Sequence, residues 1–234
     1  STASKLGGVV ALAAIVQRLD TGPLVAVLAV LTMTVGNFCA LNQKNLKRML
    51  AYSGIAHAGY MLMGLAILTS DGLIAILFYI VVYLIMNVGA FLVVAMIGNS
   101  TASEDIEAYR GLAWRGAALP AVCLAVFLFS LTGLPPFAGF IGKFLLFAAV
   151  LKEGGIFIVL ALVAVANSVV SLYYYAKVVK VMFLDTPEAG DNAVALGCNH
   201  YALLIPLTVL TIVLGLYFQP LVQYAALSLQ FFVK

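Results

Sequence analysis

Lys143 is the residue best placed to do chemistry in this sequence, because it stands inside a long apolar run. Its neighbours from residue 140 to residue 144 are aromatic, aliphatic or glycine. An ammonium near the centre of a bilayer costs about 2.5–3.5 kcal/mol on insertion scales, so we expect it to face a hydrated or paired interior. A buried lysine can give up and regain a proton near neutral pH. Lys143 is therefore predicted to relay protons, and the competing interpretation is a structural kink with the lysine paired to a neighbouring carboxylate.

A predicted helix break lies a few residues before Lys143. Gly133, Pro135 and Pro136 interrupt the run from 119 to 151, which is too long for one straight membrane crossing. Two prolines remove two backbone donors and clash with the preceding turn, so the helix should divide into two halves. The freed carbonyls and amides then need water or polar partners, which could form a path for protons.

His57 and Lys5 are the other candidate members of a proton relay. Ser53, His57 and Tyr60 share one helical face at i, i+4 and i+7. Histidine titrates near neutral pH and can accept on one ring nitrogen while donating on the other, although a packing histidine fits the pattern equally well. Lys5 lies near the start of the first apolar run, where a lysine often extends to the membrane surface instead of serving a function.

Two other groups of residues are given structural interpretations. The three tyrosines at 173–175, together with Lys177 and Lys180, are predicted to form an aromatic and cationic belt at the membrane interface. The three cysteines stand far apart, without the spacing of a metal or iron–sulfur site, and are interpreted as packing residues.

The elements that must position these residues are membrane-spanning helices. Hydrophobic residues make up 65% of the 234 residues and charged residues only 9%, a balance that indicates a chain solvated by lipid. The expected fold class is all-α, a polytopic transmembrane helical bundle with about seven spans and one broken helix. The predicted spans cover residues 3–19, 24–41, 46–68, 73–97, 119–151 (broken), 155–183 and 201–218, followed by an interfacial amphipathic tail at 221–234.

Several classes of function are excluded by what the sequence lacks. The net charge of +3 is small and scattered, and no basic run with interleaved aromatics indicates nucleic-acid binding. There is no phosphate loop, haem-ligand pair, metal-ligand spacing or nucleophile constellation. No carboxylate lies in the middle of a predicted span, so a relay here would depend on lysine, histidine, hydroxyl groups and water.

The sequence resembles the antiporter-like membrane subunits of respiratory complex I, the NADH:quinone oxidoreductase, most of all those of the subunit N type. The matching motifs extend over nearly the whole chain. They are ASK at 3–5, NLKRMLAYS at 45–53, HAGY at 57–60, YRGL at 109–112, GLPP at 133–136, GFIGKF at 139–144 and LYYY at 172–175. The resemblance implies a fold of fourteen helices with two inverted five-helix repeats, of which this chain supplies the carboxyl-terminal half. The first repeat, with its own broken-helix lysine and paired glutamate, has no counterpart in this sequence.

The resemblance also assigns roles and boundaries. Lys143 corresponds to the lysine of the second broken helix, Lys5 to the lysine that joins the two half-channels, and His57 to a polar position on the central hydrophilic axis. Residues 1–22 would form the bridging helix, 23–185 the five-helix repeat with its broken helix at 119–151, and 186–234 a polar loop, the last spanning helix and the tail.

The implied activity is proton translocation driven by redox chemistry on other subunits. No cofactor is expected on this chain, because NADH, FMN, iron–sulfur clusters and quinone would be bound by those other subunits. The expected partners are other membrane subunits of the complex, including neighbouring antiporter-like subunits, and the lipid bilayer of an energy-transducing membrane, the bacterial inner membrane. Two alternatives stay open: a subunit of a multi-subunit sodium/proton antiporter, and an assembly scaffold that transports nothing.

Overall fold

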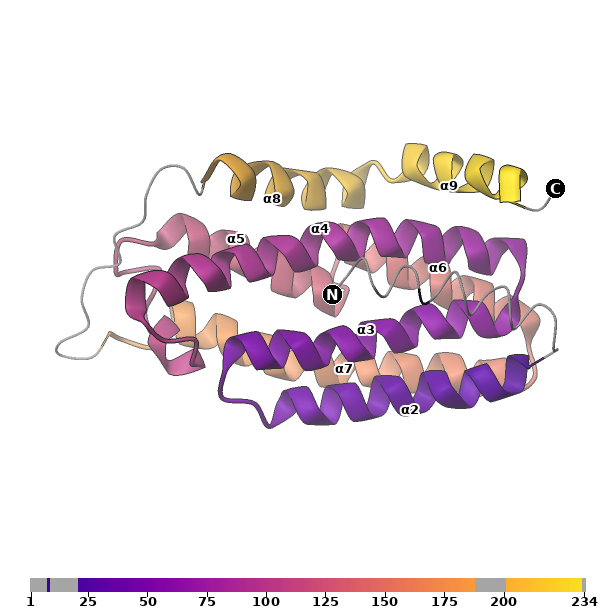
Figure 1. Ribbon diagram of the computed structural model, residues 1–234, viewed down its shortest axis with the longest axis horizontal. Coiled ribbons are helices and arrows are strands. Elements are labelled where there is room, and N and C mark those ends of the chain that lie inside the picture. The colour runs from indigo at the N-terminus through magenta and orange to yellow at the C-terminus, as the bar shows by residue number, and fades with distance from the viewer. Residues whose placement is uncertain (1–7, 9–20, 188–200, 233–234) are drawn as a thin grey trace.

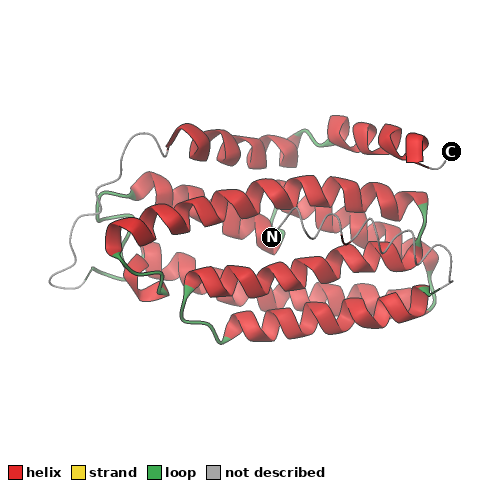
Figure 2. Cartoon of the chain, in the orientation of Figure 1, coloured by secondary structure: helices red, strands yellow, loops and turns green. Residues whose placement is uncertain are grey.

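The computed structural model describes residues 8, 21–187 and 201–232, so the predicted first span and Lys5 lie outside the described residues, except for Gly8. The described part is built from helices, with a single isolated β-bridge between Asn45 and Asp105 (Figure 2). The elements are α2 (Gly22–Leu41), α3 (Leu46–Ile67), α4 (Ser70–Thr101), the 3-10 helix η1 (Ile106–Tyr109), α5 (Ala118–Thr132), α6 (Ala138–Glu153), α7 (Ile156–Phe183), α8 (Tyr201–Leu216) and α9 (Gln219–Phe232).

The helix ends follow from local sequence signals. Pro23 stands in the first turn of α2, where a missing N–H costs nothing. The Asn45 side chain accepts a hydrogen bond from the backbone N–H of Arg48 at 3.0 Å and so caps α3, and the Thr69 side chain caps α4 through the N–H of Gly72 at 3.3 Å. The predicted ends of the second to sixth spans agree with these helices to within a few residues, the largest difference being the longer α4.

The longer helices α2, α3, α4 and α7 lie side by side along the long axis of the molecule (Figure 1). α2 packs against α3 and α7, and α4 packs against α5, α6 and α8. Because α6 also contacts α3, α7 and α8, the second half of the broken span lies among four helices besides α5, and one of its faces is buried in the bundle.

The predicted break in the fifth span is present. α5 ends at Thr132 and α6 begins at Ala138, and the Pro135–Pro136 peptide bond between them is cis. Gly133 adopts a φ of +93° as the C-cap of α5, a left-handed conformation that favours glycine.

The last predicted span is shorter than expected. α8 ends at Leu216 and α9 follows at an angle of 83°. Pro220 lacks the N–H that would bond to the carbonyl of Leu216 and stands in the first turn of α9, where no such bond is needed. The tail is helical as predicted, and its place at the membrane interface stays a prediction.

The apolar helices agree with a multi-pass membrane protein. Among the described residues, four helices are long and apolar enough to cross a membrane, namely α2, α3, α4 and α7, and the bent pair of α8 and α9 raises the number to five. α5, with 15 residues, is apolar but short, because the break divides its span. The expected fold class is confirmed, while the division of the chain at residues 22 and 185 stays a prediction.

Candidate functional site

Lys143 is buried in the bundle, with only 4% of its surface exposed. Its Nζ donates hydrogen bonds to the backbone carbonyl of Thr132 at 2.8 Å and to Oγ of Ser168 at 3.2 Å. The same ammonium lies over the ring of Tyr60, 4.5 Å from the ring centroid, where the electron-rich face attracts a cation. The lysine is therefore held by three neutral groups that come from α5, α7 and α3.

The helix break supplies the first of these acceptors. In an uninterrupted helix the carbonyl of Thr132 would accept a bond from the N–H of residue 136. That residue is Pro136, which has no N–H. The carbonyl is thus left free inside the membrane-spanning part of the bundle, and the ammonium of Lys143, one helical segment later, satisfies it.

The two halves of the broken span pack closely at the same place. The N–H of Gly139, at the start of α6, donates to Oγ of Ser130 at 3.1 Å. A Cβ on residue 139 would lie 1.8 Å from the carbonyl oxygen of Ser130, so only glycine fits. This approach sets where α6 begins and, with it, the position of Lys143 one turn later.

His57 lies next to this centre. Its Nδ1 is 2.6 Å from the Tyr79 hydroxyl, a hydrogen bond whose donor depends on the histidine tautomer. The imidazole ring is 6.0 Å from the Tyr60 ring and 4.9 Å from the Tyr83 ring, between centroids. His57 and Lys143 thus contact the same tyrosine, Tyr60, and α3 and α6 bring the two predicted relay residues into one cluster.

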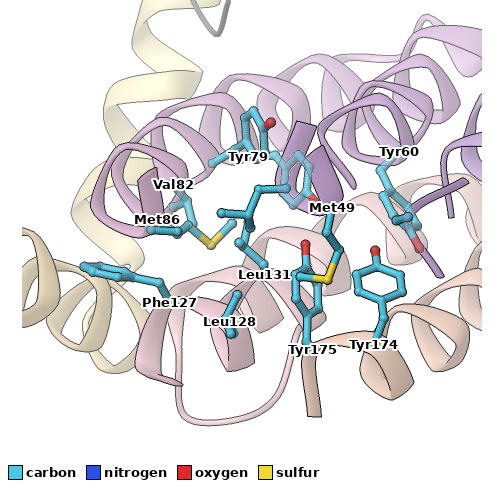
Figure 3. Close-up of a cluster of buried hydrophobic side chains, with 14 of the residues drawn as sticks. Met49, Tyr60, Tyr79, Val82, Met86, Phe127, Leu128, Leu131, Tyr174 and Tyr175 are labelled. Atoms are coloured by element: carbon cyan, nitrogen blue, oxygen red, sulfur yellow. The ribbon is translucent and has the colours of Figure 1, made fainter. Parts of the chain in front are cut away.

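The predicted belt of three tyrosines is wrong for two of its members. Tyr173 is 64% exposed, whereas Tyr174 and Tyr175 are buried in the core, where their rings lie near Met49 and Tyr60 (Figure 3). Consecutive helical residues point about 100° apart, so a run of three cannot share one lipid-facing surface. The Tyr174 hydroxyl donates to Oδ1 of Asn37 at 2.9 Å, which makes it part of the buried polar interior.

The competing interpretation of Lys143 required a carboxylate partner. Among the described residues Lys143 forms no ion pair with a carboxylate, since the four ion pairs found there belong to other lysines and arginines. The side chains that the sequence-based prediction missed are Ser168, Tyr79 and the amides Asn37 and Asn167. Their signal was a polar residue inside an apolar helix, which does not by itself say what the residue touches.

The imidazoles, thiols and carboxylates of the described residues do not gather into a metal site near this cluster. No group of three or more histidine, cysteine, aspartate or glutamate side chains found there could hold a metal ion. A cavity of about 830 Å³ lies elsewhere, between the start of α3 and the carboxyl-terminal part of α4. Its lining includes Asn45, Lys47, Glu104 and Asp105, and it shares no residue with the surroundings of Lys143.

The chain is similar to curated proteins whose names identify them as NADH-quinone oxidoreductase subunit N. It is 48% identical over 214 residues to "NADH-quinone oxidoreductase subunit N" of Anaeromyxobacter sp. (strain Fw109-5), a match that covers 89% of this chain and 41% of that protein. It is 52% identical over 206 residues to "NADH-quinone oxidoreductase subunit N 2" of Sorangium cellulosum (strain So ce56), covering 86% of this chain and 40% of that protein. The chain thus spans about two fifths of the length of these relatives.

Chains of known structure superpose on this chain and share its fold. A chain of respiratory complex I from Thermus thermophilus with bound aureothin superposes with a TM-score of 0.74 at 36% identity, covering 86% of this chain and 45% of that chain. A chain of the Mrp complex from Dietzia sp. DQ12-45-1b superposes with a TM-score of 0.80 at 24% identity, covering 88% of this chain and 46% of that chain, which supports the fold alone.

The family model that matches describes "NADH:quinone oxidoreductase/Mrp antiporter, TM" and covers residues 1–170. This match extends over most of the chain and includes α2 to α6 and Lys143. The resemblance predicted from the motifs is confirmed: the chain belongs to the NADH:quinone oxidoreductase/Mrp antiporter transmembrane family.

Proposed function

We propose that this chain acts as a proton-translocating membrane subunit of an NADH:quinone oxidoreductase of the subunit N type. The observation that carries the proposal is the position of Lys143, a buried ammonium that reaches a helix-break carbonyl and a hydroxyl in place of a carboxylate. Ionisable residues within membrane-spanning segments commonly mark ion or proton pathways.

The surroundings of Lys143 suit a group that changes its charge during turnover. The Thr132 carbonyl and the Tyr60 ring favour the ammonium form, because each interacts with positive charge. The Ser168 hydroxyl can accept a hydrogen bond from the ammonium and can also donate one to the neutral amine. The site can thus hold both protonation states, as a relay requires.

The rest of the proposed pathway uses the other predicted residues. Protons would pass between Lys143 and the outer aqueous side, and His57 would join Lys143 through the shared contact with Tyr60. Lys5, outside the described residues, would connect this half-channel to the other repeat. Gly133, Pro135 and Pro136 would have the structural role of freeing the carbonyl that Lys143 uses.

The redox chemistry would take place elsewhere in the assembly. NADH, FMN, iron–sulfur clusters and quinone would be bound by other subunits, and this chain would contribute no redox centre. Its partners would be the other membrane subunits of the complex, including neighbouring antiporter-like subunits, in a bacterial inner membrane.

The decisive experiment replaces Lys143 in the intact complex. We expect Lys143→Ala to lower redox-driven proton pumping in vesicles about tenfold or more, because the only described buried ammonium is gone. Lys152→Ala is the matched control, since Lys152 lies nine residues further along α6 and its side chain is 68% exposed. Normal pumping by the Lys143→Ala complex would overturn the proposal.

The Mrp side of the family provides the alternative function. The matching family model covers both kinds of protein, and the sodium/proton antiporter would need no electron donor. Sodium-dependent proton flux in vesicles without NADH or quinone would favour that alternative. Pumping that survives simultaneous neutralisation of Lys5 and Lys143 would favour an assembly scaffold.

A further inference from the structure

A pair of buried amides joins α2 to α7 beside the lysine site. Nδ2 of Asn37 donates both to the backbone carbonyl of Asn167 at 3.1 Å and to its side-chain Oδ1 at 2.9 Å. Both side chains are buried, with 1% and 7% of their surfaces exposed. We call this pair, Asn37 and Asn167, the amide clasp.

The remaining polar atoms of the amide clasp are also satisfied. Oδ1 of Asn37 accepts the hydrogen bond from the Tyr174 hydroxyl at 2.9 Å. Nδ2 of Asn167 donates to the carbonyl of Val163 at 3.0 Å and to Oγ1 of Thr34 at 3.3 Å. A fully bonded polar group in an apolar interior is held in one geometry, because every displacement leaves a donor or acceptor without a partner.

The residue that follows Asn167 is Ser168, which touches both Lys143 and Tyr60. Its Oγ accepts from Nζ of Lys143 at 3.2 Å and lies 3.0 Å from the Tyr60 hydroxyl. Adjacent residues on a helix turn and slide together. The hydrogen bonds that hold Asn167 against α2 therefore also set the rotation of α7 about its axis, and its position along that axis, at Ser168.

A hydrogen bond that sets the relative position of two helices matters most for helices in a membrane. Apolar contacts between spanning helices specify position weakly, since lipid offers similar contacts, whereas buried hydrogen bonds and close packing do specify it. Amide groups do not readily pass protons, because they change charge far outside the physiological range. The amide clasp is thus suited to holding the relay and unsuited to being one of its links.

We infer that the amide clasp of Asn37 and Asn167 positions the Ser168 hydroxyl against Lys143, so that these three residues act on proton transfer through Lys143. This inference rests on the proposed function, since it concerns the transfer step assigned to Lys143. Asn37 and Asn167 are positioning residues, and Ser168 is the group in contact with the lysine.

The test is a double-mutant cycle in the intact complex, reconstituted in vesicles and driven by NADH oxidation. Ser168→Ala removes the acceptor and should lower the pumping rate about tenfold, since a hydrogen bond to a charged group is lost. Ser168→Thr keeps a hydroxyl and should restore most of the rate. Asn37→Ala should lower the rate by a factor of about three to ten.

The double variant Asn37→Ala/Ser168→Ala then separates positioning from general stability. If Asn37 acts through Ser168, the double variant pumps no more slowly than Ser168→Ala alone, because the second change has nothing left to misplace. If the amide clasp only stabilises the bundle, the two losses multiply. Multiplied losses would overturn the inference.

Two further variants supply a milder change to the amide clasp and a control that leaves it intact. Tyr174→Phe removes one bond to Asn37 and gives a milder form of the same defect should Asn37→Ala prevent assembly. Thr32→Ala on α2 should pump normally, because its exposed hydroxyl bonds only to the carbonyl of Leu28 in its own helix among the described contacts.

The Lys143→Ala complex in the same vesicles distinguishes the two proposals. Pumping retained by Lys143→Ala would reject the proposed function itself. Pumping lost by Lys143→Ala but unchanged by Asn37→Ala and Ser168→Ala would reject the amide clasp alone.

Discussion

Two lysines on α6 lie in opposite environments, one exposed and one buried. Lys152 lies at the end of the helix, is 68% exposed and forms an ion pair with Asp71 at 2.6 Å. Lys143 lies in the interior and meets a carbonyl, a hydroxyl and an aromatic ring. Asp71 and water compensate the charge of Lys152, whereas buried neutral groups of the fold surround the charge of Lys143. The difference agrees with the proton-relay role that we propose for Lys143.

The same contrast extends to whole regions of the molecule. Ion pairs occupy the helix ends and loops, as in Lys47 with Glu104 at 2.6 Å and Lys180 with Asp185 at 3.5 Å. The described interior is joined instead by amides, hydroxyls and one imidazole. A buried carboxylate would stabilise the ammonium strongly and would hinder release of its proton. Lys143 is instead held by neutral groups, which attract its charge less strongly.

The largest loss of stability is expected where the buried ends of α5 and α6 pack together at the helix break, in contrast to the exposed helix ends. Gly139→Ala would place a Cβ 1.8 Å from the Ser130 carbonyl oxygen, so α5 and α6 must separate, at a cost of about 3 kcal/mol or more. Gly98→Ala is the control at the end of α4, where the new Cβ meets its nearest atom at an ordinary 3.5 Å. Heating the purified complex and following thiol labelling of the buried Cys123 by mass spectrometry measures the loss. Equal labelling temperatures for the two variants would contradict the described packing.

An intermediate loss of stability and pumping is expected when the His57 imidazole loses its hydrogen bond. Tyr79→Phe removes the hydroxyl 2.6 Å from Nδ1 of His57, which should cost about 1–3 kcal/mol in stability and lower pumping. Tyr173→Phe is the matched change on a tyrosine that is 64% exposed and should alter neither. The labelling assay and the vesicle assay together measure both effects. A Tyr79→Phe complex as stable and as active as the Tyr173→Phe complex would show that the bond to His57 has no role.

The smallest effect is expected at the exposed ion pair. Asp71→Asn leaves Lys152 without its partner, and exposed pairs of this kind contribute about 0–1 kcal/mol that salt further weakens. The labelling temperature should fall slightly in low salt and match that of the unaltered complex in high salt. A large loss that persists in high salt would mean that the helix end resembles the interior more than its exposure indicates.

Much of the helical framework could be predicted from the sequence. Apolar runs, Pro23, Asn45 and the prolines at 135 and 136 locate the helices and the break, because hydropathy and the missing proline N–H act within a few residues. The last span was predicted to end two residues beyond Leu216, the end of α8, and the helical tail was expected near Pro220. Tyr174 and Tyr175 were misplaced because aromatic residues near cations are common at membrane interfaces as well as in cores.

The candidate site was predictable only in its centre. Lys143 is conspicuous because its charge conflicts with its neighbours in the chain, and that conflict is visible without a structure. Its partners depend on how α3, α5 and α7 rotate and pack against α6, and residues such as Ser168 and Asn37 look ordinary in a linear sequence. The sequence therefore determined which charge must be compensated and where the helix breaks. The tertiary structure decided which neutral groups compensate that charge, since contacts between distant helices follow from the packing of the whole bundle.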